Sequence, residues 1–147
     1  MFTRKEIVDY SVTMGCNRDL TQKGMATTPY GDVFCIATLT GAYPDGIYYD
    51  KGQKSPKEAR YCGVYGKDAP DRLCKWHIET RKNVAVTKTD GVKTFVYLFE
   101  KTGLHSKEYF FHGRYKYISP EMINSINPEH KEEILFHLLF IDRPVLV

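Results

Sequence analysis

The order of apolar and polar residues predicts a chain built mainly of β-strands. Continuous or alternating apolar residues are typical of buried and half-buried strands. The four strongest segments are 32–40, 93–100, 109–118 and 134–141. For the last of these, a helix that begins at Pro128 is the alternative.

Two weaker segments extend the same pattern. Residues 61–65 form a short strand-like stretch, and 83–88 precede the segment 93–100 across Thr89-Asp90-Gly91. Because Asp-Gly favours tight turns, the sequence predicts a hairpin between 83–88 and 93–100.

Helix signals stand at the front of the chain and between the strands. Thr3 and Glu6 form a Thr-x-x-Glu capping box, which predicts a helix over the first fourteen residues. Ser119-Pro120-Glu121 and Asn127-Pro128-Glu129 predict the starts of short helices, and 71–80 fits another. The expected class is therefore mainly β, of the α+β type.

Length and composition are those of one domain with its own core. The chain has 147 residues, of which 42% are hydrophobic, and no apolar run approaches the roughly 18 residues of a membrane span. The first residues lack the apolar core of a signal peptide, so we expect a cytoplasmic protein, or a nuclear one in a eukaryote, that is not secreted. Cys74 and His77 supply two ligands where zinc needs four, so no metal site is expected.

The charge is distributed unevenly along the chain. Between Lys51 and Lys93 eleven basic residues oppose five acidic ones, a net charge of +6, whereas Glu121–Val147 carries −3. The basic stretch also contains Tyr61, Tyr65 and Trp76. Cations beside aromatic rings suit phosphate contacts and base stacking, so this stretch favours a nucleic-acid partner.

The second half carries a more specific pattern. Tyr61-Cys62-Gly63 is followed by Asn83-Val84-Ala85-Val86, by Tyr109-x-Phe-His-Gly-x-Tyr-Lys-Tyr117, and by the closing strand at 136–140. This succession resembles the SRA (SET and RING associated, or YDG) domain over residues 31–143, behind an N-terminal helix within 1–17. The resemblance implies a single domain with a PUA-like twisted β-barrel and short flanking helices. One departure is His112, which stands where the family has Asp.

An SRA-like domain would grip double-stranded DNA and flip a modified cytosine, such as 5-methylcytosine or 5-hydroxymethylcytosine, into an aromatic pocket. The resemblance assigns a base pocket to Tyr43, Asp45, Tyr61 and Gly63. It assigns backbone contacts to Lys67, Arg81, Lys82, Asn83 and Arg114. The domain would be a non-catalytic reader without cofactors, for example the specificity module of a modification-dependent restriction system, with a partner or fused nuclease domain.

A second resemblance is to the GIY-YIG nucleases. Gly46-Ile47-Tyr48, Tyr61, Arg72 and His77 match the front half of that pattern, and Glu100 is the candidate ligand for Mg²⁺. A metal, an Arg and a proton-transferring group are what phosphodiester hydrolysis requires. A small metal-dependent endonuclease is therefore one alternative, and a PUA-like module that binds RNA or protein is another.

Overall fold

The computed structural model describes residues 1–17, 24–38, 46–48, 58–62, 86, 89, 94–101, 108–124 and 132–146. The helix α1 spans Arg4–Thr13. The strands are β1 Phe2–Thr3, β2 Met25–Thr27, β3 Val33–Thr38, β4 Gly46–Tyr48, β5 Glu58–Cys62, β6 Val96–Lys101, β7 Glu108–Asn124 and β8 Glu132–Asp142. No helix within these ranges is long and apolar enough to cross a membrane.

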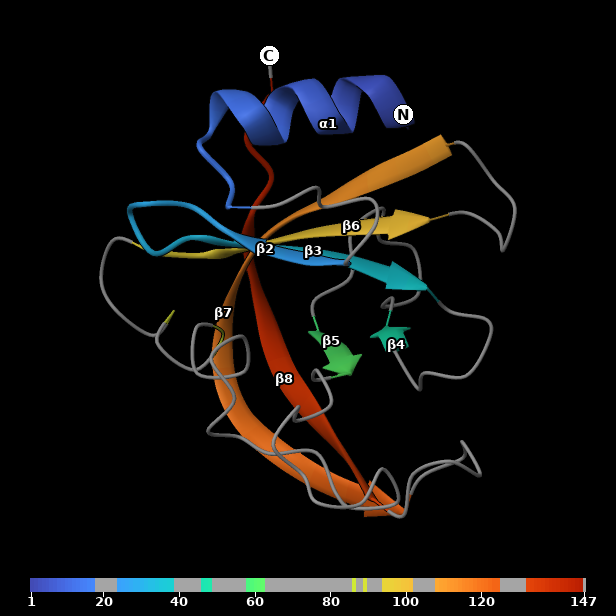
Figure 1. Cartoon of the computed structure of the whole chain (residues 1–147). Helices are drawn as coiled ribbons and strands as arrows, with labels where there is room; N and C mark the ends of the chain where they lie inside the picture. Colours follow the sequence, from blue (N-terminus) through green and yellow to red (C-terminus); the bar gives the residue numbers. More distant parts are fainter. Residues whose placement is uncertain are drawn as a thin grey trace.

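The strands form one bent sheet in the order β2-β3-β6-β7-β8-β5-β4 (Figure 1). The short strand β1 pairs with the start of β7. Neighbours are antiparallel except β3 and β6, which are parallel. The predicted mainly-β class is confirmed. The expected barrel is an open sheet in the described residues, because the path ends at β2 and β4 without a pairing between them.

The long strands β7 and β8 form the arc that dominates Figure 1. They pair from Arg114 and Asp142 to Asn124 and Glu132. The prediction that a helix opens at Ser119-Pro120-Glu121 is wrong, because β7 continues through these residues. Proline is tolerated there because residues 116–124 pair with β8 and with no other described strand, so one edge needs no N–H donor.

The predicted hairpin between 83–88 and 93–100 is also wrong. Its second strand exists as β6, but β6 pairs with β3 on one edge and with β7 on the other. No edge remains for a partner from 83–88, and Val86 is helical and fully buried. Of the other predicted helices, 71–80 lies outside the described residues, as does Asn127-Pro128-Glu129.

Two apolar clusters cover opposite faces of β3 and β6. The inner core comprises Met25, Val33, Cys35, Ala37, Ala59, Tyr61, Val86, Val96, Leu98, Tyr115, Leu135, Phe136 and Leu138. The helix-side core comprises Ile7, Ala26, Phe34, Ile36, Tyr97, Phe99, Tyr109 and Phe111. Alternate residues of each strand point to opposite faces, so β3 and β6 read as continuous apolar runs.

The helix α1 begins as the sequence predicts. Thr3 and Glu6 form the capping box, with the Glu6 N–H donating to Thr3 Oγ1 and the Thr3 N–H donating to Glu6 Oε1. The helix covers the helix-side core through buried Ile7 and through Tyr10, whose ring stacks on Phe34 with centroids 5.7 Å apart. The chain therefore closes one face of its sheet with its first fourteen residues (Figure 1).

Substituting Gly113 with alanine should destabilise the fold by at least about 2 kcal/mol. Gly113 has a φ of 133°, and an added Cβ would lie 2.5 Å from the Asp142 carbonyl oxygen and 2.7 Å from Phe140 Cε2. Urea unfolding measures the loss. Gly31→Ala is the control, because its Cβ would meet the movable methyl of Thr94 at 3.2 Å and should cost less. Equal losses would show that backbone strain alone, rather than the contact with β8, fixes this glycine.

Candidate nucleic-acid interface

The hairpin of β4 and β5 joins two of the segments to which the sequence assigns the base pocket. Tyr43, Asp45 and Gly63 lie outside the described residues, but the strands that follow and precede them are described. Gly46 of β4 pairs with Arg60 of β5, so the start of β4 and the end of β5 lie side by side. The chain therefore enters β4 after Asp45 and leaves β5 before Gly63 at the same end of this hairpin.

Tyr61 ties this end of β5 to the first strands of the sheet. Its hydroxyl donates to the Gly24 carbonyl oxygen at 2.7 Å, and the same oxygen accepts from the Ile36 N–H at 2.8 Å. Gly24 has a φ of 71°, which suits a residue without a side chain. One carbonyl thus joins β5, β3 and the residue that precedes β2.

The Tyr61 ring is part of the inner core and is 6% exposed. A base can stack only on a ring face that is open. Tyr61 would therefore have to leave its place beside Phe136 and Leu138 before it could hold a flipped base. Its assignment as the stacking ring stays a prediction. The contacts that the structure describes for Tyr61 are structural ones, in the inner core and with Gly24.

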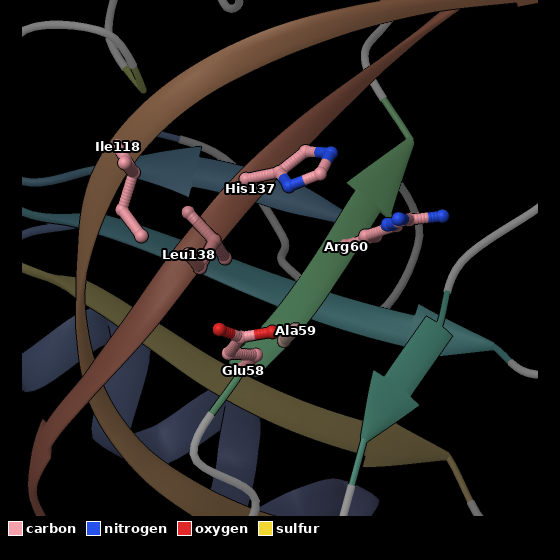
Figure 2. Close-up of a pocket in the computed structure, with 6 residues that line it drawn as sticks. All are labelled: Glu58, Ala59, Arg60, Ile118, His137 and Leu138. Carbon is pink, nitrogen blue, oxygen red and sulfur yellow. The ribbon is translucent and has the colours of Figure 1, made fainter.

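A cavity of about 340 Å³ lies on the opposite face of β5. Figure 2 shows Ile118 of β7 on one side of β8, and Glu58 and Arg60 of β5 on the other, with His137 between them. Strand alternation explains the division, because Ala59 and Tyr61 point into the inner core while Glu58 and Arg60 point away from it. The cavity thus combines donors, one carboxylate and an apolar wall.

Arg114 of β7 is held by a carboxylate. Its Nε and Nη2 donate to the two oxygens of Asp142 at 2.6 and 2.5 Å. This hydrogen bonding raises the pKa of Arg114 and lowers the pKa of Asp142. The guanidinium also lies 4.2 Å from the ring centroid of Phe95, beside the amine of Lys116 at 4.1 Å. The predicted contact of Arg114 with a DNA phosphate stays a prediction, and in this structure a carboxylate occupies its donors.

His112, the departure from the family pattern, is fully buried on β7. Burial, and to a smaller extent the charge of Arg143, lower its pKa to about 4. Its Nε2 lies 3.6 Å from Glu100 Oε2, whose own pKa is raised by burial. Because the imidazole is neutral at pH 7, this is a polar contact rather than an ion pair. The contact joins the neighbouring strands β6 and β7.

The residues of the nuclease alternative are spread over the sheet. Arg72 and His77 lie outside the described residues, and Tyr48 ends β4. Tyr61 lies on β5 and Glu100 on β6, and β7 and β8 separate those two strands in the sheet order. The described part of the chain contains no group of three His, Cys, Asp or Glu side chains that could hold a metal ion. The strand pairing therefore does not bring Glu100 to Tyr61.

No family model and no curated protein matches this sequence, but solved structures match its fold. The SUVH5 SRA domain in complex with hemimethylated CG DNA is 18% identical, with a TM-score of 0.62 over 100% of this chain and 90% of that chain. The modification-dependent TagI restriction endonuclease is 18% identical, with a TM-score of 0.60 over 95% of this chain and 47% of that one. The chain has the fold of an SRA domain.

A third match is the sulfur binding domain and SRA domain of ScoMcrA complexed with phosphorothioated DNA, at 14% identity and a TM-score of 0.60. It covers 98% of this chain and 39% of that one. The SRA-like fold thus spans nearly the whole chain, whereas TagI and ScoMcrA are more than twice as long as the part matched. The similarity expected from the strand motifs is confirmed at the level of the fold.

Sequence reasoning missed the cavity of this SRA-like fold. It placed His137 only within the closing strand at 136–140 and gave Glu58 and Arg60 no role. The signal that was available is alternation, since Glu58 and Arg60 are the polar positions of β5. The pairing of Arg60 with His137 was not readable, because strand register between distant segments depends on the whole sheet.

Tyr61→Phe should lower the free energy of unfolding by about 1 kcal/mol, because it removes the hydroxyl that donates to Gly24. Urea unfolding followed by circular dichroism measures it. Tyr30→Phe is the control, since Tyr30 is 83% exposed and should change nothing. Unchanged stability in Tyr61→Phe would show that this hydrogen bond does not hold β5 to the first strands.

His112 should make stability fall with acid between pH 6.5 and 5. The unfolded chain binds a proton at His112 near pH 6.5 while the folded protein does not until about pH 4, so unfolding takes up a proton in this window. The slope approaches about 1.4 kcal/mol per pH unit. His112→Gln should remove this part of the slope in urea unfolding at successive pH values. Parallel curves for the two proteins would refute a neutral, buried His112.

Proposed function

We propose that this protein is a reader of double-stranded DNA that recognises a modified cytosine by flipping it out of the duplex. The single observation that carries the proposal is the SRA-like fold over the whole chain, shared with the SUVH5 SRA domain in complex with methylated DNA. The basic stretch between Lys51 and Lys93, with its net charge of +6, adds the electrostatic attraction that binding a duplex requires.

Base flipping accounts for why such a reader needs an aromatic pocket. Extruding a base costs a few kcal/mol of stacking and pairing, and stacking on a side-chain ring returns about 1–3 kcal/mol. Tyr43 and Asp45, which directly precede β4, are the residues we propose for the ring and for the acceptor of the exocyclic amine. Tyr61 contributes by holding this end of β5 to Gly24.

The biological setting we propose is a modification-dependent restriction system. TagI, which shares the fold, is a modification-dependent restriction endonuclease, and this chain corresponds to about half of its length. The cleavage step would then belong to a nuclease partner or to a fused domain. This chain would supply recognition only.

The test is a fluorescence-anisotropy titration of matched duplexes that contain cytosine, 5-methylcytosine or 5-hydroxymethylcytosine at one site, with and without magnesium. We expect one modified duplex to bind at least about tenfold more tightly than the unmodified one, a difference of about 1.4 kcal/mol. Gel analysis of each sample should show intact DNA. Equal affinities, or cleavage that requires magnesium and Arg72, would overturn the reader and favour the nuclease.

Two variants test the pocket. Tyr43→Ala and Asp45→Ala should each lower the affinity for the modified duplex to that for the unmodified one. Tyr30→Ala, which removes an 83% exposed side chain, is the matched control and should keep the preference. A variant that loses preference but still folds, judged by circular dichroism, supports the assignment. Preference retained in both variants would place the pocket elsewhere.

A further inference from the structure

Exposed apolar side chains gather on the outer face of the sheet, which is the face of β5, β8 and the second half of β7 that points away from the inner core. Ile118 of β7 and Leu139 and Ile141 of β8 are all exposed. Leu139 and Ile141 are alternate residues of one strand, and Ile118 lines the cavity on this face together with Glu58 (Figure 2). Apolar side chains grouped on a polar surface are typical of an interface with another protein.

The strand pairing gives this apolar patch a charge pattern. Lys116 of β7 pairs with Leu139, and Leu139 pairs with the exposed Glu58 of β5. A cation and a carboxylate therefore flank Leu139 in one row across three strands, each about 4.8 Å from it along the backbone. Lys116 Nζ donates to the Thr94 carbonyl oxygen and lies 4.1 Å from the Phe95 ring centroid. These contacts hold the amine in place and leave its positive charge.

Such a row is complementary to itself. Two copies can pack with their outer faces about 10 Å apart, around a twofold axis that runs along β8 between the two sheets. That axis sets Leu139 against Leu139 of the second copy. It also exchanges the two sides of the row, so Lys116 of each copy faces Glu58 of the other.

The charges select this arrangement from the possible face-to-face ones. An axis that runs across the strands would instead set Lys116 against Lys116 and Glu58 against Glu58, and like charges repel. The axis along β8 also suits the neighbouring row, in which Ser119 pairs with His137 and His137 with Arg60. In that row the arginine of each copy faces the serine of the other, so no like charges meet in either row.

We propose that the outer face is the interface of a homodimer and that its occupant is a second copy of this chain. Its centre is formed by Leu139 with Ile118 and Ile141, and the two pairs of Lys116 and Glu58 flank it. A second copy supplies both charges at the required spacing by symmetry, whereas an unrelated partner would have to match them separately. The dimer does not depend on DNA binding, so it and the proposed function can fail independently.

The experiment is sedimentation equilibrium of the full chain without DNA, at concentrations between about 1 µM and 1 mM. We expect dimers whose dissociation constant rises at least about tenfold in Leu139→Ser, which removes the apolar centre. Val12→Ser is the matched control, because it removes an exposed apolar side chain from α1 and should leave the constant unchanged. Circular dichroism shows whether each variant is folded.

Charge exchange tests how the two copies are arranged. Glu58→Lys and Lys116→Glu should each weaken the dimer about threefold or more, because like charges then face each other. An equimolar mixture of the two variants should recover the wild-type affinity, since lysine faces glutamate at both contacts of the mixed dimer. If Lys116→Glu does not fold, Leu139→Ser and Glu58→Lys decide the question.

Three results would overturn the proposal. The first is a wild-type protein that stays monomeric at the highest concentration. The second is a dimer that Leu139→Ser leaves unchanged, because its interface would lie on another surface. The third is a dimer that Leu139→Ser weakens but that a mixture of folded charge variants does not recover, because the copies would then be arranged differently.

Discussion

The structure depends on β7 being shared between two parts of one sheet. Its first half pairs with β6 from Tyr109 to Tyr115, and its second half pairs with β8 from Arg114 to Asn124. The pairing partner of β7 changes from β6 to β8 at Gly113 and Arg114. Gly113 has a φ of 133°, and because it has no side chain, β8 can approach it more closely than any Cβ would allow. Arg114 then fixes the partner strand through its two hydrogen bonds to Asp142. From this point β7 and β8 stay paired to Asn124 and Glu132, through two shifts of register, one between Arg114 and Tyr115 and one between Tyr117 and Ser119.

The change of the partner of β7 from β6 to β8 also decides which surfaces of the sheet are exposed. On the β6 side of β7, both faces of the sheet are buried, one under α1 and one in the inner core. On the β8 side, only one face is buried, so Glu58 and Arg60 of β5 point outward, as do His137 and the exposed Leu139 and Ile141 of β8. This is why Arg60 and His137 meet in a cavity while their chain neighbours Tyr61 and Phe136 pack together inside.

Local signals in the sequence predicted those elements whose stability is local. The capping box of Thr3 and Glu6 marks α1 correctly, and the apolar run at 134–141 gives β8. The failures involve distant partners. Ser119-Pro120 looks like a helix start, yet β8 holds it as a strand, and 83–88 looks like a hairpin arm, yet β3 and β7 already occupy β6. The candidate site follows the same pattern. The sequence shows that Glu58 and Arg60 are the polar residues of β5, but it does not show which residues of β8 pair with them.

Neighbouring residues of the short strand β5 lie on opposite faces of the sheet. Tyr61 points inward and is bonded to Gly24, at the end of β5 from which the chain continues to Gly63. Arg60 points outward, one residue earlier, and pairs with His137 of β8. Because β5 spans only Glu58–Cys62 and pairs with β8 along all five residues, its register with β8 fixes both side chains at once. The hydrogen bond from Tyr61 to the Gly24 carbonyl oxygen holds β5 to the first strands of the sheet, so the strand that lines the cavity on one face is anchored in the core on the other.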